Sequence, residues 1–154
     1  LYSESYHKQK NEMTQYLSLD SSSSFFMCMH TAPPIIWVEE FFKYDAGWLH
    51  NFISDNEDDL LRLSWDDINY PCRIGVFAAA GIPMIQRNNP FCKVASQNLL
   101  QEQNIGILYN NIEELSIYLH DTKKMALLAQ NVMKQRMNFT FDSHVPELIR
   151  LFKI

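Results

Sequence analysis

The stretch INYPCRIGVFAAAGIPMIQRNNP, residues 68–90, decides the fold class. A proline near its start and a run of small apolar residues predict a helix over residues 71–80. Gly81 ends that helix because glycine takes the left-handed conformation without a Cβ clash. The apolar residues 82–86 then predict a buried strand, which runs into the polar sequence Arg-Asn-Asn. A short helix followed directly by a buried strand is typical of a parallel α/β sheet.

Strand-like and helix-like segments alternate on both sides of this stretch. Further strands are expected at residues 25–30, 46–52 and 105–109. Further helices are expected at residues 33–45, 94–104, 112–121, 123–137 and 144–152. This order predicts an α/β fold with a Rossmann-like, open, mostly parallel sheet flanked by helices and followed by a helical C-terminal tail.

Composition and charge narrow the class of protein. The 154 residues fit one domain, and a net charge of −5 without a basic stripe argues against nucleic acid as a partner. The longest apolar runs are far shorter than the roughly 20 residues of a membrane span. The three cysteines are widely spaced and have apolar neighbours, which indicates reduced thiols in a cytoplasmic protein rather than disulfides or a zinc site. The opening LYSESY has neither a methionine nor a secretory signal, so we expect residues 1–154 to be one domain of a longer polypeptide.

Polar residues follow each expected strand. They are His30 and Thr31, His50 and Asn51, Arg87 to Asn89, and Asn110 and Asn111. In open parallel sheets, ligands bind beyond the carboxyl ends of the strands, so these pairs predict a polar cleft at one edge. The simpler alternative is that surface loops are polar whatever they do.

Arg73 is the candidate residue with the clearest chemistry. Asn69 is expected to cap the helix, Pro71 fits its first turn, and Arg73 would lie where backbone N–H groups point outward. A helix start carries about half a positive charge, so a cation there is unfavourable unless an anion joins it. Arg73 is therefore a candidate phosphate ligand. The alternative is a surface arginine paired with Asp66 or Asp67.

The acidic run DNEDD, residues 55–59, is the one segment that resembles a metal site. It lacks the spacing of a calcium loop, and we interpret it as a solvated turn. No metal and no cofactor are expected.

Four segments in series resemble one enzyme family. Residues 68–86 resemble the pattern N-x-P-x-[KR]-x-x-E-Y-x-A-x-G-x-P-V-I, and WVEEFFKYDAGWLHNF resembles the helix–strand unit that precedes it. IGILYNNIEELSIYLHD is similar to I-G-x-x-x-x-x-x-E-L-x-x-x-L-x-D, and the segment around FTFDSH resembles the helical tail found beside it. These patterns belong to bacterial GT-B glycosyltransferases.

The resemblance implies a C-terminal, donor-binding domain of a two-domain enzyme, which would be inactive in isolation. Such a domain holds a nucleotide-diphosphate sugar. The missing N-terminal half would supply the acceptor site, usually the general base, and any peripheral membrane contact. GT-B enzymes generally need no metal, because a helix dipole and basic side chains stabilise the departing diphosphate.

The resemblance also implies roles for individual residues. Asn69, Arg73, His50, Asn88 and Asn89 would contact the diphosphate or the sugar, and His30, Thr31 and Phe77 would lie at the nucleotide. Two positions depart from the family pattern. Val76 stands where the family has a glutamate that often binds the ribose, and Asn88, Asn89 and Pro90 stand where many members have glycines.

Two other functions stay open at this point. A nucleotide-sugar epimerase would need an acidic pair in the cleft, which only Asp66 and Asp67 offer. A non-catalytic domain that binds a partner protein would use the acidic loop and Trp65 as its contact surface. An Arg73 that faces an open crevice favours the enzyme. An Arg73 tied to a carboxylate, with Phe77 closing the crevice, favours the partner-binding domain.

Overall fold

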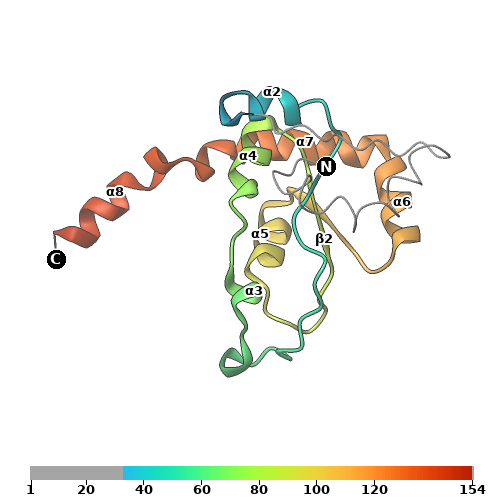
Figure 1. The fold of residues 1–154 in the computed structure, drawn as a ribbon, viewed down its shortest axis with the longest axis horizontal. Helices are drawn as coiled ribbons and strands as arrows, with labels where there is room; N and C mark the ends of the chain where they lie inside the picture. The colour runs from blue at the N-terminus through green and yellow to red at the C-terminus, as the bar shows by residue number, and fades with distance from the viewer. Residues whose placement is uncertain (1–32, 154) are drawn as a thin grey trace, which may run out of the picture. The chain divides into compact units, whose positions relative to one another are not determined.

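The computed structural model describes residues 33–153 (Figure 1). The chain divides into two units, residues 1–37 and 38–154, and everything below concerns the second unit unless stated. In the first unit the described part is residues 33–37, with the short 3-10 turn η1 (Pro34–Ile36). The strand expected at residues 25–30, together with His30 and Thr31, lies outside the described residues.

Three short strands and a larger number of helices make up the described chain (Figure 1). The strands are β1 (Gly47–Trp48), β2 (Met84–Arg87) and β3 (Gly106–Tyr109). The helices and 3-10 turns after η1 are α2 (Trp37–Phe41), η2 (Leu60–Arg62), α3 (Trp65–Ile68), α4 (Arg73–Ala80), α5 (Ala95–Gln103), α6 (Ile112–His120), α7 (Thr122–Gln135), η3 (Arg136–Phe139) and α8 (Phe141–Phe152). Within residues 33–153, no helix has both the length and the apolar character needed to cross a bilayer.

The strands form one parallel sheet in the order β1-β2-β3. Met84 is the residue in register with both Gly47 of β1 and Gly106 of β3. The prediction of an α/β fold with a parallel sheet, flanking helices and a helical C-terminal segment is therefore confirmed, with three strands in the described part.

Several expected boundaries were wrong. The helix expected at residues 71–80 begins at Arg73, because the carbonyl of Pro71 first accepts the N–H of Ile74 in a separate turn. The helix expected at residues 33–45 forms only as η1 and the short α2, which ends at Phe41. Neither element buries a residue, so packing does not extend the helix.

The two faces of the sheet have separate hydrophobic cores, because side chains alternate along each strand. Met84 of β2 packs in one cluster with apolar residues of α4 and α5. Ile85, the next residue, packs in the other cluster with apolar residues of α6 and α7. Helix α8 has apolar residues at positions 141, 145, 148 and 152, yet none of its side chains is buried.

Two glycines set how closely α4 and α5 approach the sheet. A Cβ atom on Gly47 would lie 2.6 Å from the ring of Phe77 in α4. A Cβ atom on Gly106 would lie 2.9 Å from Leu100 of α5, and closer still to the backbone carbonyl of Met84. Only glycine fits at either position in this packing.

Phe77 belongs to the core and not to a ligand site. Its side chain is only 6 % exposed, and its ring packs edge-on against Phe41 with centroids 5.5 Å apart. The expected contact between Phe77 and a nucleotide does not fit this placement. The reason is that Gly47 leaves the space into which the ring turns.

Alanine substitution at two glycines should change stability in opposite directions. Gly106→Ala should lower the free energy of unfolding by about 1–3 kcal/mol, because the added methyl meets the Met84 carbonyl and Leu100. Gly75→Ala is the matched control, since a Cβ atom at Gly75 in α4 would meet no described atom within 4 Å other than its chain neighbours and the backbone of its own helix. Removing a helical glycine there should raise the free energy of unfolding by about 0.5–1 kcal/mol. Urea unfolding measures both, and equal effects would contradict the close approach at Gly106.

Candidate functional site

The polar residues that follow the three described strands meet at one edge of the sheet. The hydroxyl of Tyr109, at the end of β3, donates to Oδ1 of Asn51, which follows β1, over 2.7 Å. Nδ2 of Asn88, after β2, donates to Oδ1 of Asn110, after β3, over 3.0 Å. The expected convergence of strand ends is therefore confirmed for three of the four pairs.

Arg73 lies at this edge, beside the end of β1. Its Nη2 donates to the carbonyl of Leu49 over 2.5 Å, and its charge acts on the neighbouring His50. No carboxylate within residues 33–153 forms an ion pair with it. The alternative pairing with Asp66 or Asp67 does not occur. The exposed guanidinium thus keeps most of its N–H donors available.

Asn69 does not cap α4. It follows α3, and its backbone N–H donates to the carbonyl of Trp65. Tyr70 and Pro71 lie between Asn69 and the N-cap position of α4, which is held by Cys72 without any side-chain hydrogen bond. The first-turn N–H groups of α4 consequently have no side-chain cap, and they lie next to Arg73.

The surroundings of His50 at this edge favour its neutral form. Burial lowers its pKa, the positive charge of Arg73 lowers it further, and Asp66 partly opposes both effects. Its ring packs edge-on against Phe52 with centroids 5.1 Å apart. Its Nε2 is buried and has no hydrogen-bond partner among residues 33–153. A neutral imidazole with a spare ring nitrogen suits hydrogen bonding to a ligand better than charge pairing.

Asn88 and Asn89, although adjacent, have different surroundings. Asn89 is 2 % exposed, and its side chain accepts from the N–H of Ser54 over 2.6 Å and donates to the carbonyls of Phe52 and Arg87. These contacts use its amide to join loops, which leaves it little capacity to bind a ligand. Asn88 lines an open pocket of about 290 Å³. The pocket is lined by Ile53, Ser54, Arg87, Asn88, Asn89, Pro90 and Asn110.

Arg87 is a candidate that the sequence analysis did not single out as a ligand. It is the last residue of β2 and lines this pocket, and no carboxylate within the described chain pairs with it. It lies near the phenol of Tyr109, whose pKa burial raises and the Arg87 charge lowers in part. The sequence feature that could have identified Arg87 is its position as a basic residue at the end of an expected strand.

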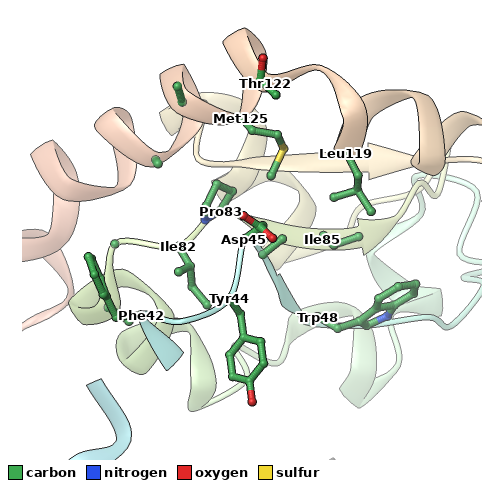
Figure 2. Close-up of a pocket in the computed structure, with 15 residues that line it drawn as sticks. Phe42, Tyr44, Asp45, Trp48, Ile82, Pro83, Ile85, Leu119, Thr122 and Met125 are labelled. Atoms are coloured by element: carbon green, nitrogen blue, oxygen red, sulfur yellow. The ribbon is translucent and has the colours of Figure 1, made fainter. Parts of the chain in front are cut away.

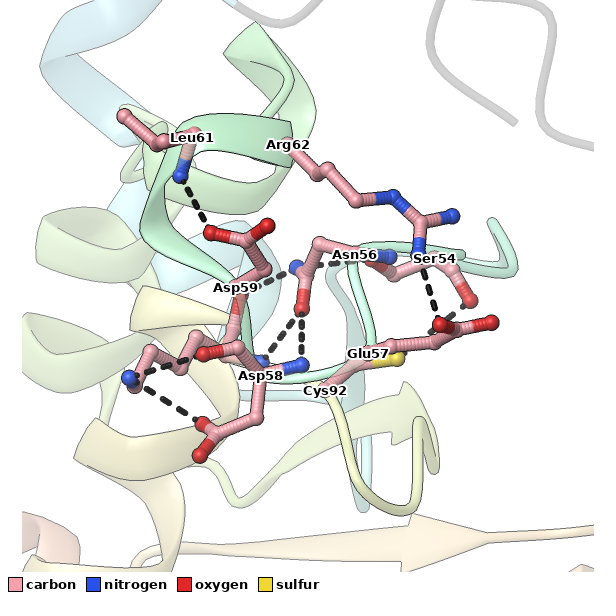
Figure 3. A network of polar contacts seen from close by, with 9 residues as sticks. Ser54, Asn56, Glu57, Asp58, Asp59, Leu61, Arg62 and Cys92 are labelled. Atoms are coloured by element: carbon pink, nitrogen blue, oxygen red, sulfur yellow. Dashed lines mark hydrogen bonds and ion pairs between the residues drawn. The ribbon is translucent and has the colours of Figure 1, made fainter.

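Asn56 joins the loop after β1 to the loop after β2 (Figure 3). This fully buried side chain accepts from the N–H of Lys93 over 3.0 Å and donates to its carbonyl over 2.9 Å. Lys93 also bonds to Asp58, and the thiol of Cys92 donates to the carbonyl of Ser54 (Figure 3). The acidic run 55–59 is therefore part of a hydrogen-bonded turn that fixes one wall of the pocket.

A larger apolar groove of about 690 Å³ lies elsewhere, beside the residues that precede β1 and β2 (Figure 2). Figure 2 shows Leu119 of α6 and Met125 of α7 pointing toward Ile85, with Trp48 at the side. Of the residues that the structure describes, Asp45 is the one charged residue that lines it. A groove without cations does not suit a diphosphate, so the carboxyl edge is the better candidate despite its smaller pocket.

Removing the Asn56 side chain should destabilise the protein. Asn56→Ala leaves the backbone N–H and C=O of Lys93 without their partners, so the free energy of unfolding should fall by about 2–3 kcal/mol. Asn138→Ala is the control, because the Asn138 amide makes an exposed contact with Gln135. Urea unfolding measures the loss, and hydrogen exchange at the Lys93 amide locates it. If Asn56→Ala lowers the free energy of unfolding no more than Asn138→Ala does, Asn56 does not hold the two loops together.

The positive charge of Arg73 should hold the pKa of His50 down. Because folding lowers the His50 pKa below its usual value of about 6.5, the unfolded chain binds the proton more readily. Stability should therefore fall as the pH drops below about 6.5. Arg73→Gln should raise the His50 midpoint in an NMR titration, whereas Arg62→Gln, which alters the exposed pair with Glu57, should not. An unchanged midpoint in Arg73→Gln would place the guanidinium away from the imidazole.

No protein-family model, curated protein or solved structure matches this chain. The resemblance to GT-B glycosyltransferases therefore stays a prediction.

Proposed function

We propose that this chain is the donor-binding domain of a metal-independent GT-B glycosyltransferase, which binds a nucleotide-diphosphate sugar at the carboxyl edge of its sheet. The observation that carries the proposal is the position of Arg73. Its guanidinium lies at the end of β1, next to the uncapped start of α4, without a carboxylate partner among the described residues. A cation without a carboxylate partner, beside a helix start that no side chain caps, is an arrangement that binds a diphosphate.

The role of the site in sugar transfer follows from its charges. As the bond between sugar and diphosphate breaks, negative charge builds up on the departing diphosphate. Arg73 and the N–H groups of α4 would stabilise that charge, and the neutral His50 would hydrogen-bond to a phosphate or sugar oxygen. The general base and the acceptor site would come from a second domain of the longer, cytoplasmic bacterial enzyme. The described sheet would then be part of a Rossmann-like domain.

The two alternative functions receive less support. The carboxylate of Asp67 accepts from the N–H and the hydroxyl of Ser64 in a helix cap, which leaves only Asp66 for the acidic pair of an epimerase. A partner-binding domain would have Arg73 tied to a carboxylate and Phe77 in the crevice. Arg73 has no such partner in the described chain, and Phe77 is buried in the core.

Calorimetric titration with UDP, GDP, CDP and ADP tests the proposal. At least one of these diphosphates should bind, and Arg73→Gln should weaken that binding about tenfold or more, because it removes charge-assisted hydrogen bonds. Arg136→Gln is the matched control, since Arg136 is an exposed residue of η3 whose nearest polar contact is the sulfur of Met133. The absence of binding at millimolar nucleotide, or equal binding by wild type and Arg73→Gln, would refute the diphosphate site.

A further inference from the structure

The pocket that Arg87 lines has other lining residues than the proposed diphosphate site. Its volume of about 290 Å³ lies at the lower end of ligand pockets, which suits one ring-sized group better than a whole nucleotide. Residues that follow β1, β2 and β3 all contribute to its lining. Arg73 and His50 are not among the lining residues.

One wall of the pocket offers a hydrogen-bond acceptor held in place. Asn88 uses its Nδ2 to donate to Oδ1 of Asn110, and Nδ2 of Asn110 in turn donates to Glu114 over 2.8 Å. This chain orients the Asn88 amide and leaves its Oδ1 without a partner within residues 33–153. A hydroxyl group can donate to that oxygen, whereas an ionised phosphodiester has no donor to offer.

Among the described residues, Arg87 is the one charged residue that lines the pocket. Glu114, the carboxylate closest to it along the hydrogen-bond chain, accepts from the N–H and the side chain of Asn110 and from the hydroxyl of Tyr118. The Asn110 N–H bond, supported by the other two, lowers the pKa of Glu114 and keeps it ionised, yet Glu114 forms no ion pair with Arg87. Within residues 33–153 the guanidinium fork therefore has no partner of the kind that it fits best, a planar anion.

We propose that this pocket binds the carboxylate-bearing ring of an acidic sugar, with Arg87 on the carboxylate and Asn88 on a ring hydroxyl. The inference rests on the proposed function and specifies its donor as a nucleotide-linked sugar acid. A group with both hydroxyl donors and a planar anion matches the cation and the oriented acceptor together. Ile53 and Pro90 supply the apolar surface against which the C–H face of the ring packs.

An NMR titration with two sugar phosphates tests this assignment without requiring the identity of the base. D-glucose 1-phosphate and D-glucuronate 1-phosphate carry the same phosphate and differ at C6, where only the second has a carboxylate. At 150 mM salt, the wild-type chain should bind the glucuronate about tenfold more tightly. Arg87→Gln should reduce this preference to less than twofold and leave the affinity for glucose 1-phosphate unchanged.

Two further variants separate the inference from the proposed function. Arg73→Gln should weaken both ligands by the same factor, and Arg136→Gln should change neither. Equal affinities in the wild type, or a preference that survives in Arg87→Gln, would overturn the acidic-sugar assignment while the diphosphate site stands. If neither sugar phosphate binds, the inference is overturned, and the nucleoside diphosphate titration shows independently whether the donor site fails with it.

Discussion

The close approach of two helices to the sheet is the constraint on which the structure depends. Met84 lies in register between Gly47 and Gly106, and the missing side chains of these glycines make room for Phe77 of α4 and Leu100 of α5. A larger residue in either strand would push its helix outward. The row of residues therefore fixes how closely α4 packs on the sheet, and from the first turn of α4 Arg73 reaches the carbonyl of Leu49 at the end of β1.

Because the strands are parallel, the polar residues that follow them lie together at the carboxyl edge of the sheet. Three strands that run the same way end at the same edge, so their following loops share one space. Buried amides of Asn56 and Asn89 hold two of these loops together, while the guanidinium groups of Arg73 and Arg87 have no carboxylate partner in the described chain. Loops held by hydrogen bonds beside two cations suit an anionic ligand, because less ordering is needed on binding.

The sequence was sufficient to predict an α/β fold with parallel strands that end in polar residues, because this follows from local patterns, although the strand expected at residues 46–52 forms only as Gly47–Trp48. It was not sufficient to predict how individual side chains are used. The side chain of Asn89 accepts a hydrogen bond from the backbone N–H of Ser54, 35 residues away in the sequence. The ring of Phe77 occupies the space that Gly47 leaves by having no side chain. Asn69 fails as a cap because Tyr70 and Pro71 lie between it and the N-cap position of α4. Such outcomes depend on contacts between distant segments, which residue types and spacing do not encode.

The most direct measurement is a map of backbone amide shifts in ¹H–¹⁵N spectra while a nucleoside diphosphate is added. If the carboxyl edge binds the diphosphate, the shifts should cluster in residues 49–51, at the start of α4 from Arg73, and in residues 87–89. The amides around the apolar groove at Leu119 and Met125 should stay unchanged. Shifts confined to that groove, with the carboxyl edge unaffected, would contradict the central claim.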